Sequence, residues 1–389
     1  MNEKNQTLVS EIVLLGFQNL HNFKIPLFSL FLLIYIMTVW ENVLIIVLVS
    51  SSRNLQSPMY FFLQQLSVCD FLESTIIVPI LLKTIIYDKV ILSSVGCMIQ
   101  FFFFSASESF ECFLLAVMSY DRYVAISSPL RYSSIMSHRV CVTLIVLIWL
   151  SSFSVTLIYH NIIWTLDFCD QNTMNHFFCD LFPLLELSCS ETFFVQIEVV
   201  ILSVPVVIIP FILIIISYTC IAHEILKIVS NTGRQKAFST CSSHLAVVSI
   251  FYGTIIAIYL VPPRKESQAI SKVLSLLYTT VIPMVNPVIY SLRNKDMNDA
   301  LKNLKVFQLP LPYGDSQAAL QLPAALSLFS SSTCRLHKKT QAQSLLHYRE
   351  LLQEDGSVFE SSGWRIQRME DSEDGDSIYQ HLKHVSHVV

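Results

Sequence analysis

The chain has 389 residues, of which 53% are hydrophobic and only 14% are charged, and its formal net charge is −4. A soluble domain carries more charge and has less apolar surface to bury, so this composition indicates that lipid is the solvent for much of the chain. The negative net charge argues against a nucleic-acid partner.

Seven apolar segments follow one another along the chain. The core of a bilayer requires about 20 apolar residues per helix. The length and continuity of these segments favour helices over a β-barrel, because a spanning helix satisfies its own backbone polar groups. The sequence therefore predicts an all-α membrane protein, a seven-transmembrane-helix bundle, with spans at 26–50, 57–82, 94–127, 140–160, 195–222, 236–261 and 270–292.

The distribution of Lys and Arg predicts the orientation of this bundle. Neither residue occurs within 140–226, and basic residues collect in the loops that face the cytosol if the N-terminus is outside. The loop near 161–194 is acidic and would lie outside, whereas the loop near 262–269 runs against the trend. The balance predicts a multi-pass protein with an extracellular N-terminus, in which Asn5 of the motif NQT is a glycosylation site.

Two further segments follow the seventh span. Residues 294–304, NKDMNDALKNL, predict a short amphipathic eighth helix on the inner membrane surface. The segment 306–389 is rich in Ser, Gln, His and charge, which is typical of disorder. We therefore expect a seven-helix membrane domain over 1–304 and a cytosolic, low-complexity, disordered tail over 305–389, to which the sequence assigns no function.

The third span carries the polar residues that are most informative. Polar groups inside a membrane are costly and mark candidate functional sites. At about 100° per residue, Glu108 and Glu111 share one helical face with Arg122, which lies at the cytosolic end of the span. Arg122 can pair with its neighbour Asp121, or release it and meet a partner protein. The alternative for a lone Arg is a side chain that only reaches the membrane interface.

Four longer motifs are specific enough to indicate a protein family. They are LQSPMYFFL at 55–63, MSYDRYVAI at 118–126, KAFSTCSSHL at 236–245 and PMVNPVIYSLRN at 283–294. Their order and content resemble the signatures of the odorant (olfactory) receptors, a family of rhodopsin-like G-protein-coupled receptors. The resemblance extends over about 12–304.

This resemblance implies a function. An odorant receptor binds a small volatile, largely apolar ligand within the helix bundle and activates a stimulatory heterotrimeric G protein of the olfactory type, which raises cyclic AMP. The expected location is the plasma membrane, in the cilia of olfactory sensory neurons. An enzyme is not expected, because the sequence has no phosphate-binding glycine loop, no HExxH motif and no nucleophile elbow.

Three alternatives remain open at this point. One is a receptor of the same fold for a non-olfactory ligand. Another is a seven-span transporter or channel, for which the sequence lacks the expected paired broken helices and internal repeats. The third is a receptor made inactive by Glu41 or by its long tail. Glu41 stands where the family usually has Gly, and a carboxyl in a span costs about 2.5–3.5 kcal/mol unless it is protonated or paired.

The resemblance also assigns roles to individual residues. The expected ligand-binding residues are Phe104, Ser105, Glu108, Ser109, Ile256, Tyr259 and Thr279. The expected switch for G-protein coupling consists of Asp121, Arg122, Tyr123, Tyr218 and Tyr290. Three roles are possible for the Glu108 carboxyl. It can be ionised and pair with an amine ligand, or it can be protonated and donate a hydrogen bond to a carbonyl or alcohol of the ligand. It can also be a neutral group that is hydrogen-bonded to Ser105 or to a neighbouring helix.

The cysteines and the remaining acids complete the prediction. Four loop cysteines allow three pairings, and the resemblance implies the disulfides Cys97–Cys179 and Cys169–Cys189. A metal site made by His176 and these cysteines is the alternative, but an oxidising lumen favours disulfides. No cofactor is expected apart from a sodium ion at Asp70 and Glu111; protonated, hydrogen-bonded carboxyls are the alternative there.

Overall fold

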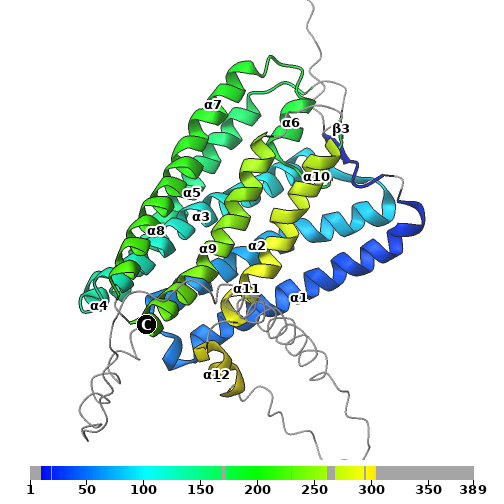
Figure 1. The fold of residues 1–389 in the computed structure, drawn as a ribbon. Coiled ribbons are helices and arrows are strands. Elements are labelled where there is room, and N and C mark those ends of the chain that lie inside the picture. The colour runs from blue at the N-terminus through cyan, green and yellow to red at the C-terminus, as the bar shows by residue number, and fades with distance from the viewer. Residues whose placement is uncertain are drawn as a thin grey trace, which may run out of the picture. The chain divides into compact units, whose positions relative to one another are not determined.

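The computed structural model describes residues 10–18, 20–168, 172–228, 230–260, 268–292 and 295–303. These residues form a bundle of long helices (Figure 1), which confirms the predicted fold class. Its long helical segments are α1 (Lys24–Ser51), α2 (Pro58–Tyr87), α3 (Ser94–Ser127), α5 (His138–Trp164), α7 (Phe193–Ser203) with η3 (Val204–Ile208) and α8 (Ile209–Lys227), α9 (Asn231–Leu260), and α10 (Gln268–Leu276) with η5 (Leu277–Val281) and α11 (Ile282–Leu292).

Six helical segments of the described chain are long and apolar enough to cross a membrane, and α2 is not among them. The α2 helix has 30 residues, about 45 Å at 1.5 Å per residue, so its length is sufficient. Its composition differs because it carries Asp70, Glu73 and Lys83. The two acids are buried inside the bundle and Lys83 lies exposed near the helix end, so neither acid faces lipid.

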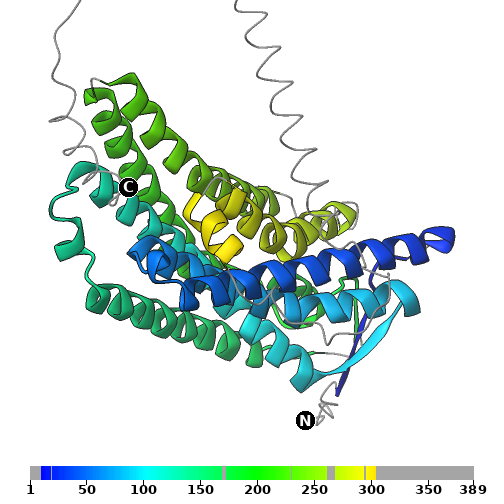
Figure 2. The ribbon, with the colours of Figure 1, turned by 90° about the horizontal axis from the view of Figure 1, so that it is seen from below.

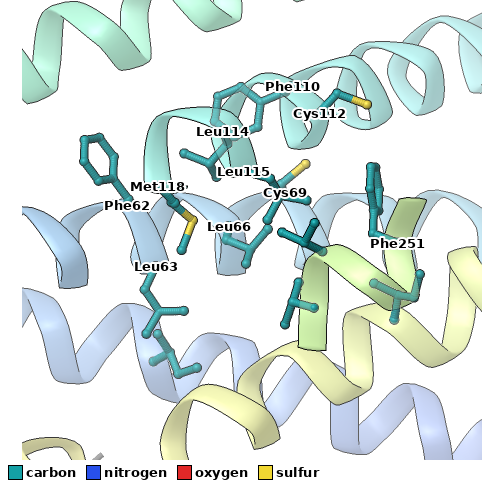
Figure 3. Packing of buried hydrophobic residues seen from close by; sticks show 14 of the residues in the cluster. Phe62, Leu63, Leu66, Cys69, Phe110, Cys112, Leu114, Leu115, Met118 and Phe251 are labelled. Atoms are coloured by element: carbon teal, nitrogen blue, oxygen red, sulfur yellow. The ribbon is translucent and has the colours of Figure 1, made fainter. Parts of the chain in front are cut away.

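The third span lies at the centre of the bundle. The α3 helix contacts α2, α5, α8 and α9, while α1 packs along α2 and α11 (Figure 2). Between α2 and α3, Leu63, Leu66 and Met118 belong to one apolar core, to which α9 adds Phe251 (Figure 3). Any side chain that faces inward from α3 therefore meets several other helices.

Two spans contain wide π-helical turns, η3 and η5. Pro205 lies within η3, and Pro283 follows η5 by two residues. Proline lacks an N–H group, and its ring clashes with the carbonyl four residues earlier, so an α-helix must open at such a position. Each wide turn rotates the residues beyond it relative to an unbroken α-helix.

A small sheet covers one end of the bundle, and the sequence analysis did not predict it. Strand β1 (Glu11–Leu14) pairs antiparallel with β2 (Val90–Ser93) and parallel with β3 (Thr173–Met174), in the order β2-β1-β3. Leu14 lies opposite Val90 and Met174 and is fully buried. We call this end, with the short helix α6 (Leu181–Leu187), the capped end.

The other end of the bundle carries the short elements η2 (Arg53–Leu55), α4 (Tyr132–Ile135) and α12 (Lys295–Asn303), and we call it the α4 end (Figure 1). The α12 helix is the predicted amphipathic eighth helix. Its residues Met297 and Ala300 are buried in the core of the bundle, and Asp296 accepts a hydrogen bond from the Tyr60 hydroxyl at 3.2 Å. The predicted tail over 305–389 lies outside the described residues.

One turn of 3-10 helix, η1 (His21–Phe23), precedes α1.

Candidate functional site

A cavity of about 80 Å³ lies between the helices near the capped end. The α3 helix contributes one face of it, and α5, α6, the end of α7, η3, α9 and η5 supply the other lining residues. Val206, Val207 and Ile255 are among its apolar lining residues. Its polar lining residues are Ser105, Glu108, Ser109, Tyr159, Asp180, Ser203 and Tyr278.

Helical periodicity places the α3 residues on this cavity. Ser105, Glu108, Ser109 and Cys112 follow the i, i+3, i+4, i+7 pattern of one helical face, and all four line the cavity. Within the described part of the chain, no hydrogen bond or ion pair engages the Glu108 carboxyl. The predicted hydrogen bond between a neutral Glu108 and Ser105 is therefore not seen among the described residues.

Asp180 is a cavity residue that the sequence analysis did not place there. It immediately follows Cys179, whose disulfide to Cys97 on α3 spans a Cα–Cα distance of 5.6 Å. Its Oδ1 accepts a hydrogen bond from the Leu181 N–H at 2.8 Å, and its Oδ2 accepts one from the Tyr278 hydroxyl at 3.5 Å. Burial raises the pKa of Asp180 to about 6, and the two hydrogen bonds oppose that rise.

Three of the predicted ligand-binding residues, Phe104, Ile256 and Thr279, do not line the cavity. Phe104 is buried beside it and packs edge-on against Phe178, with ring centroids 5.0 Å apart. The Ile256 side chain is 43% exposed and faces outward, because Ile255 holds the inward position on α9. Thr279 is 0% exposed and donates to the Ser275 carbonyl at 2.7 Å. The side chain of Tyr259 lies outside the described part of the structure.

The π-turn η5 changes the rotation of the seventh span, so that Tyr278 rather than Thr279 lines the cavity. Ile256 and Thr279 each lie one residue from a cavity-lining residue, and ligand contact at these two positions stays a prediction.

Below the cavity lies a group of buried acids. Asn286 Nδ2 lies 3.2 Å from both carboxylate oxygens of Asp70 and 3.5 Å from Glu111 Oε1. Glu73, one turn after Asp70 on α2, is also buried. Glu73 was not predicted from the sequence, although an acid three residues from Asp70 inside a span was the available signal. Three carboxyls from two helices thus face the middle of the bundle.

At the α4 end, Arg122 and Asp121 form an ion pair with 3.4 Å between Nη2 and Oδ2. The Tyr132 hydroxyl on α4 donates to Asp121 Oδ1 at 2.7 Å. Burial, followed by the charge of Asp121, raises the pKa of Tyr132, so its hydroxyl stays protonated and continues to donate. The sequence gives no local signal for Tyr132, because the contact crosses a loop.

The other predicted switch residues lie around this ion pair. The Tyr218 hydroxyl shares a hydrogen bond of 2.6 Å with His244 Nδ1. The Tyr290 hydroxyl is buried and has no hydrogen-bond partner among the described residues. Tyr123 packs instead against the apolar cluster of Ile221 and Ile225. The structure thus brings the tyrosines to the same end as Arg122, in separate contacts.

The structure also locates the remaining predicted residues. Cys189 is disulfide-bonded, and its predicted partner Cys169 lies outside the described residues, as does Asn5. The Glu41 carboxyl has a buried Oε2 without a partner in the described chain. Its neighbour Asn42 donates to the Pro283 carbonyl at 3.0 Å and thereby joins α1 to α11.

Comparison with known proteins agrees with this architecture. A family model described as olfactory receptor matches residues 31–307. Olfactory receptor 5G3 of Homo sapiens is 46% identical over 302 residues, 78% of this chain and 96% of the relative. Olfactory receptor 11L1 of Homo sapiens is 45% identical over 304 residues, 78% of this chain and 94% of the relative. Olfactory receptor 1468 of Rattus norvegicus is 44% identical over 301 residues, 77% of this chain and 96% of the relative.

Proposed function

The chain belongs to the olfactory receptor family of G-protein-coupled receptors, which are not enzymes, and from this membership we propose what its cavity and its α4 end do. The cavity lined by Ser105, Glu108 and Ser109 binds a small volatile, largely apolar odorant. The α4 end activates a stimulatory heterotrimeric G protein and raises cyclic AMP. The observation that carries this proposal is that the cavity and the Arg122–Asp121 pair lie on one continuous helix, α3.

The helix gives the two ends a physical connection. Glu108 and Arg122 are 14 residues apart on α3, about 21 Å along its axis at 1.5 Å per residue. A ligand that favours one position of α3 against its neighbours changes the environment of Arg122 at the other end. Activation is then a shift of population, in which ligand and G protein favour the same conformation.

The contacts at the α4 end define the resting state in this proposal. Arg122 is held by Asp121, and Tyr132 holds the other oxygen of the same carboxylate. The Tyr290 hydroxyl, buried without a described partner, is available to a rearranged neighbour. In the active conformation Arg122 leaves Asp121 and faces the G protein, with Tyr218 and Tyr290 closing behind it.

The proposed orientation follows from charge. The protein is a multi-pass membrane protein, and the absence of Lys and Arg within 140–226 supports an extracellular capped end and a cytosolic α4 end. Asn5 would then be glycosylated outside the cell. For a receptor with this function, we expect a location in the plasma membrane of olfactory sensory neuron cilia.

We also propose that a sodium ion binds between Asp70 and Glu111. Asn286 supplies one amide group to two buried carboxyls, which is too few donors to satisfy both when they are ionised. Carboxylate and amide oxygens are the ligands that hard cations prefer. In the described part of the chain, no group of three or more His, Cys, Asp or Glu residues could hold a metal ion, so a larger acidic site is not proposed. The ion, when bound, would compensate the charge of these carboxyls.

A cell-based cyclic-AMP screen against a broad odorant panel tests the proposed function. An agonist should raise cyclic AMP in cells that express the full chain, and Arg122→Ala should abolish the response at unchanged surface expression. Arg53→Ala is the matched control, because Arg53 is an exposed Arg at the same end of the bundle. Undiminished signalling from Arg122→Ala would contradict the role of Arg122.

A further inference from the structure

Two carboxyls from separate parts of the chain face the same cavity. Glu108 comes from the middle of α3, and Asp180 comes from the segment between the Cys97–Cys179 disulfide and α6. Both side chains are half-buried, since they line the cavity rather than the closed core. The disulfide fixes the position of Asp180 relative to α3, so the two acids belong to one prearranged site.

These acids are only weakly engaged by protein groups. Glu108 has no hydrogen bond or ion pair within the described chain, and Asp180 accepts from the Leu181 N–H at 2.8 Å and from the Tyr278 hydroxyl at 3.5 Å. No described residue that lines the cavity is a Lys, Arg or His. Two carboxyls that share a cavity without a cation repel one another when both are ionised, and a cation placed between them removes this repulsion.

Lys272 is a buried cation near the capped end, and its contacts lie elsewhere. Its Nζ donates to the carbonyl oxygens of Leu15 and Gly16, at 3.2 and 2.7 Å, and to Asn175 Oδ1 at 2.6 Å. It does not line the cavity. The β1 segment and the loop near Asn175 thus hold Lys272, and it cannot serve as the partner of Glu108 or Asp180 while these bonds persist.

The rest of the cavity limits the size and character of a ligand. Its volume of about 80 Å³ is about half that of a 150 Å³ apolar cavity that holds benzene. Val206 and Val207 from η3 and Ile255 from α9 give the cavity apolar lining. A ligand that fits has a short alkyl body and one compact polar group.

We propose that the preferred ligand of this cavity is a small aliphatic amine, whose ammonium group lies between Glu108 and Asp180 and whose alkyl group packs against Val206, Val207 and Ile255. This inference rests on the proposed function and names the ligand class of the same site. The ammonium supplies the positive charge that the cavity lacks, and its N–H groups can donate to both carboxyls. A charge-assisted hydrogen bond contributes more than a neutral one, which gives the amine its advantage over an alcohol of equal shape.

The test compares two ligands of nearly equal shape, isobutylamine and isobutanol, by titration calorimetry on the purified full-length receptor. We expect wild type to bind the amine about 10- to 100-fold more tightly than the alcohol. Glu108→Gln keeps the shape and should lower amine affinity at least about tenfold while leaving alcohol affinity unchanged, and Asp180→Asn should act in the same direction. Glu191→Gln, which changes an exposed carboxyl outside the cavity, should have no effect.

Equal affinity of wild type for the two ligands, or preference for the alcohol, would overturn the inference without any variant. An equal loss of affinity for both ligands in Glu108→Gln would also overturn the inference, because Glu108 would then act through shape or a neutral hydrogen bond. Failure of the inference is separable from failure of the proposed function. If neutral odorants raise cyclic AMP while isobutylamine does not bind, only the amine inference fails; if no odorant of either class binds or signals, the proposed function fails as well.

Discussion

Replacement of His176 by Phe should make the receptor less sensitive to acid. His176 lies at the capped end, where its Nδ1 donates to the Phe178 carbonyl at 3.2 Å and its ring stacks on Phe177 with centroids 4.8 Å apart. Its Nε2 is buried and has no partner among the described residues. Burial, reinforced by the positive charge of Lys272, lowers the pKa of His176 from 6.5 to about 3.

The sign of the effect follows from proton binding. Below pH 6.5 the unfolded chain takes up a proton at His176 that the folded chain does not, so the contribution of this residue to stability is complete above pH 6.5 and is lost as the pH falls toward 3. Between pH 7 and pH 5 the loss is about 2 kcal/mol. Asp180 acts in the opposite direction, because its raised pKa of about 6 makes the folded state gain about 1 kcal/mol over the same interval.

The difference between wild type and variant isolates His176, since Asp180 contributes equally to both. Thermal unfolding of the purified receptor at pH 7 and pH 5 measures it. The wild type should lose about 2 kcal/mol more than His176→Phe on acidification, a difference of a few degrees in the midpoint. His138→Gln, which replaces an exposed histidine on α5, should lose as much stability on acidification as wild type. If His176→Phe loses as much stability as wild type, His176 is not the buried neutral histidine described here.

Three further variants test other parts of the structure. Cys97→Ser should reduce surface delivery, because a native disulfide typically contributes about 2–5 kcal/mol, whereas Cys220→Ser should not, since Cys220 is a free cysteine; equal delivery of both, measured by cell-surface labelling, would be the contrary result. Glu41→Gly should raise surface expression by removing a buried carboxyl oxygen that has no described partner; no change would show that Glu41 is protonated or paired in the membrane. Asp70→Asn should abolish any increase in thermal midpoint that sodium chloride gives relative to potassium chloride, and a persistent sodium effect would place the ion elsewhere.

The sequence predicts the arrangement of spans well, because hydrophobicity over some 20 residues is a property of each segment alone. It also predicts the Arg122–Asp121 pair, whose members are adjacent in the chain. The amphipathic pattern of 294–304 likewise gives α12, whose buried face includes Met297 and Ala300. These features depend on local pattern and need no knowledge of the packing.

The features that were missed depend on contacts between distant segments. The residues of the sixth and seventh spans that line the cavity are Ile255 and Tyr278 rather than Ile256 and Thr279, since helix rotation and the π-turn η5 are set by packing and proline. Asp180 reaches the cavity because a disulfide brings its loop to α3.

The capping sheet was missed for the same reason. Strand β1 is only four residues long and is stabilised by pairing with segments far along the chain. The four residues Glu11–Leu14 do not alternate between polar and apolar side chains, although their burial does vary. The sequence therefore carries no period-2 signal for this strand.

The central claim is that the odorant cavity and the Arg122 end of α3 are coupled, and coupling between two sites is reciprocal. Its most direct test is the affinity of an agonist for the full-length receptor in membranes, measured with and without nucleotide-free stimulatory G protein. We expect the G protein to tighten agonist binding, by about 5- to 150-fold if the coupling is of typical size. Arg122→Ala should remove this effect while leaving the affinity without G protein unchanged. An agonist affinity that is the same with and without the G protein in wild type would contradict the account.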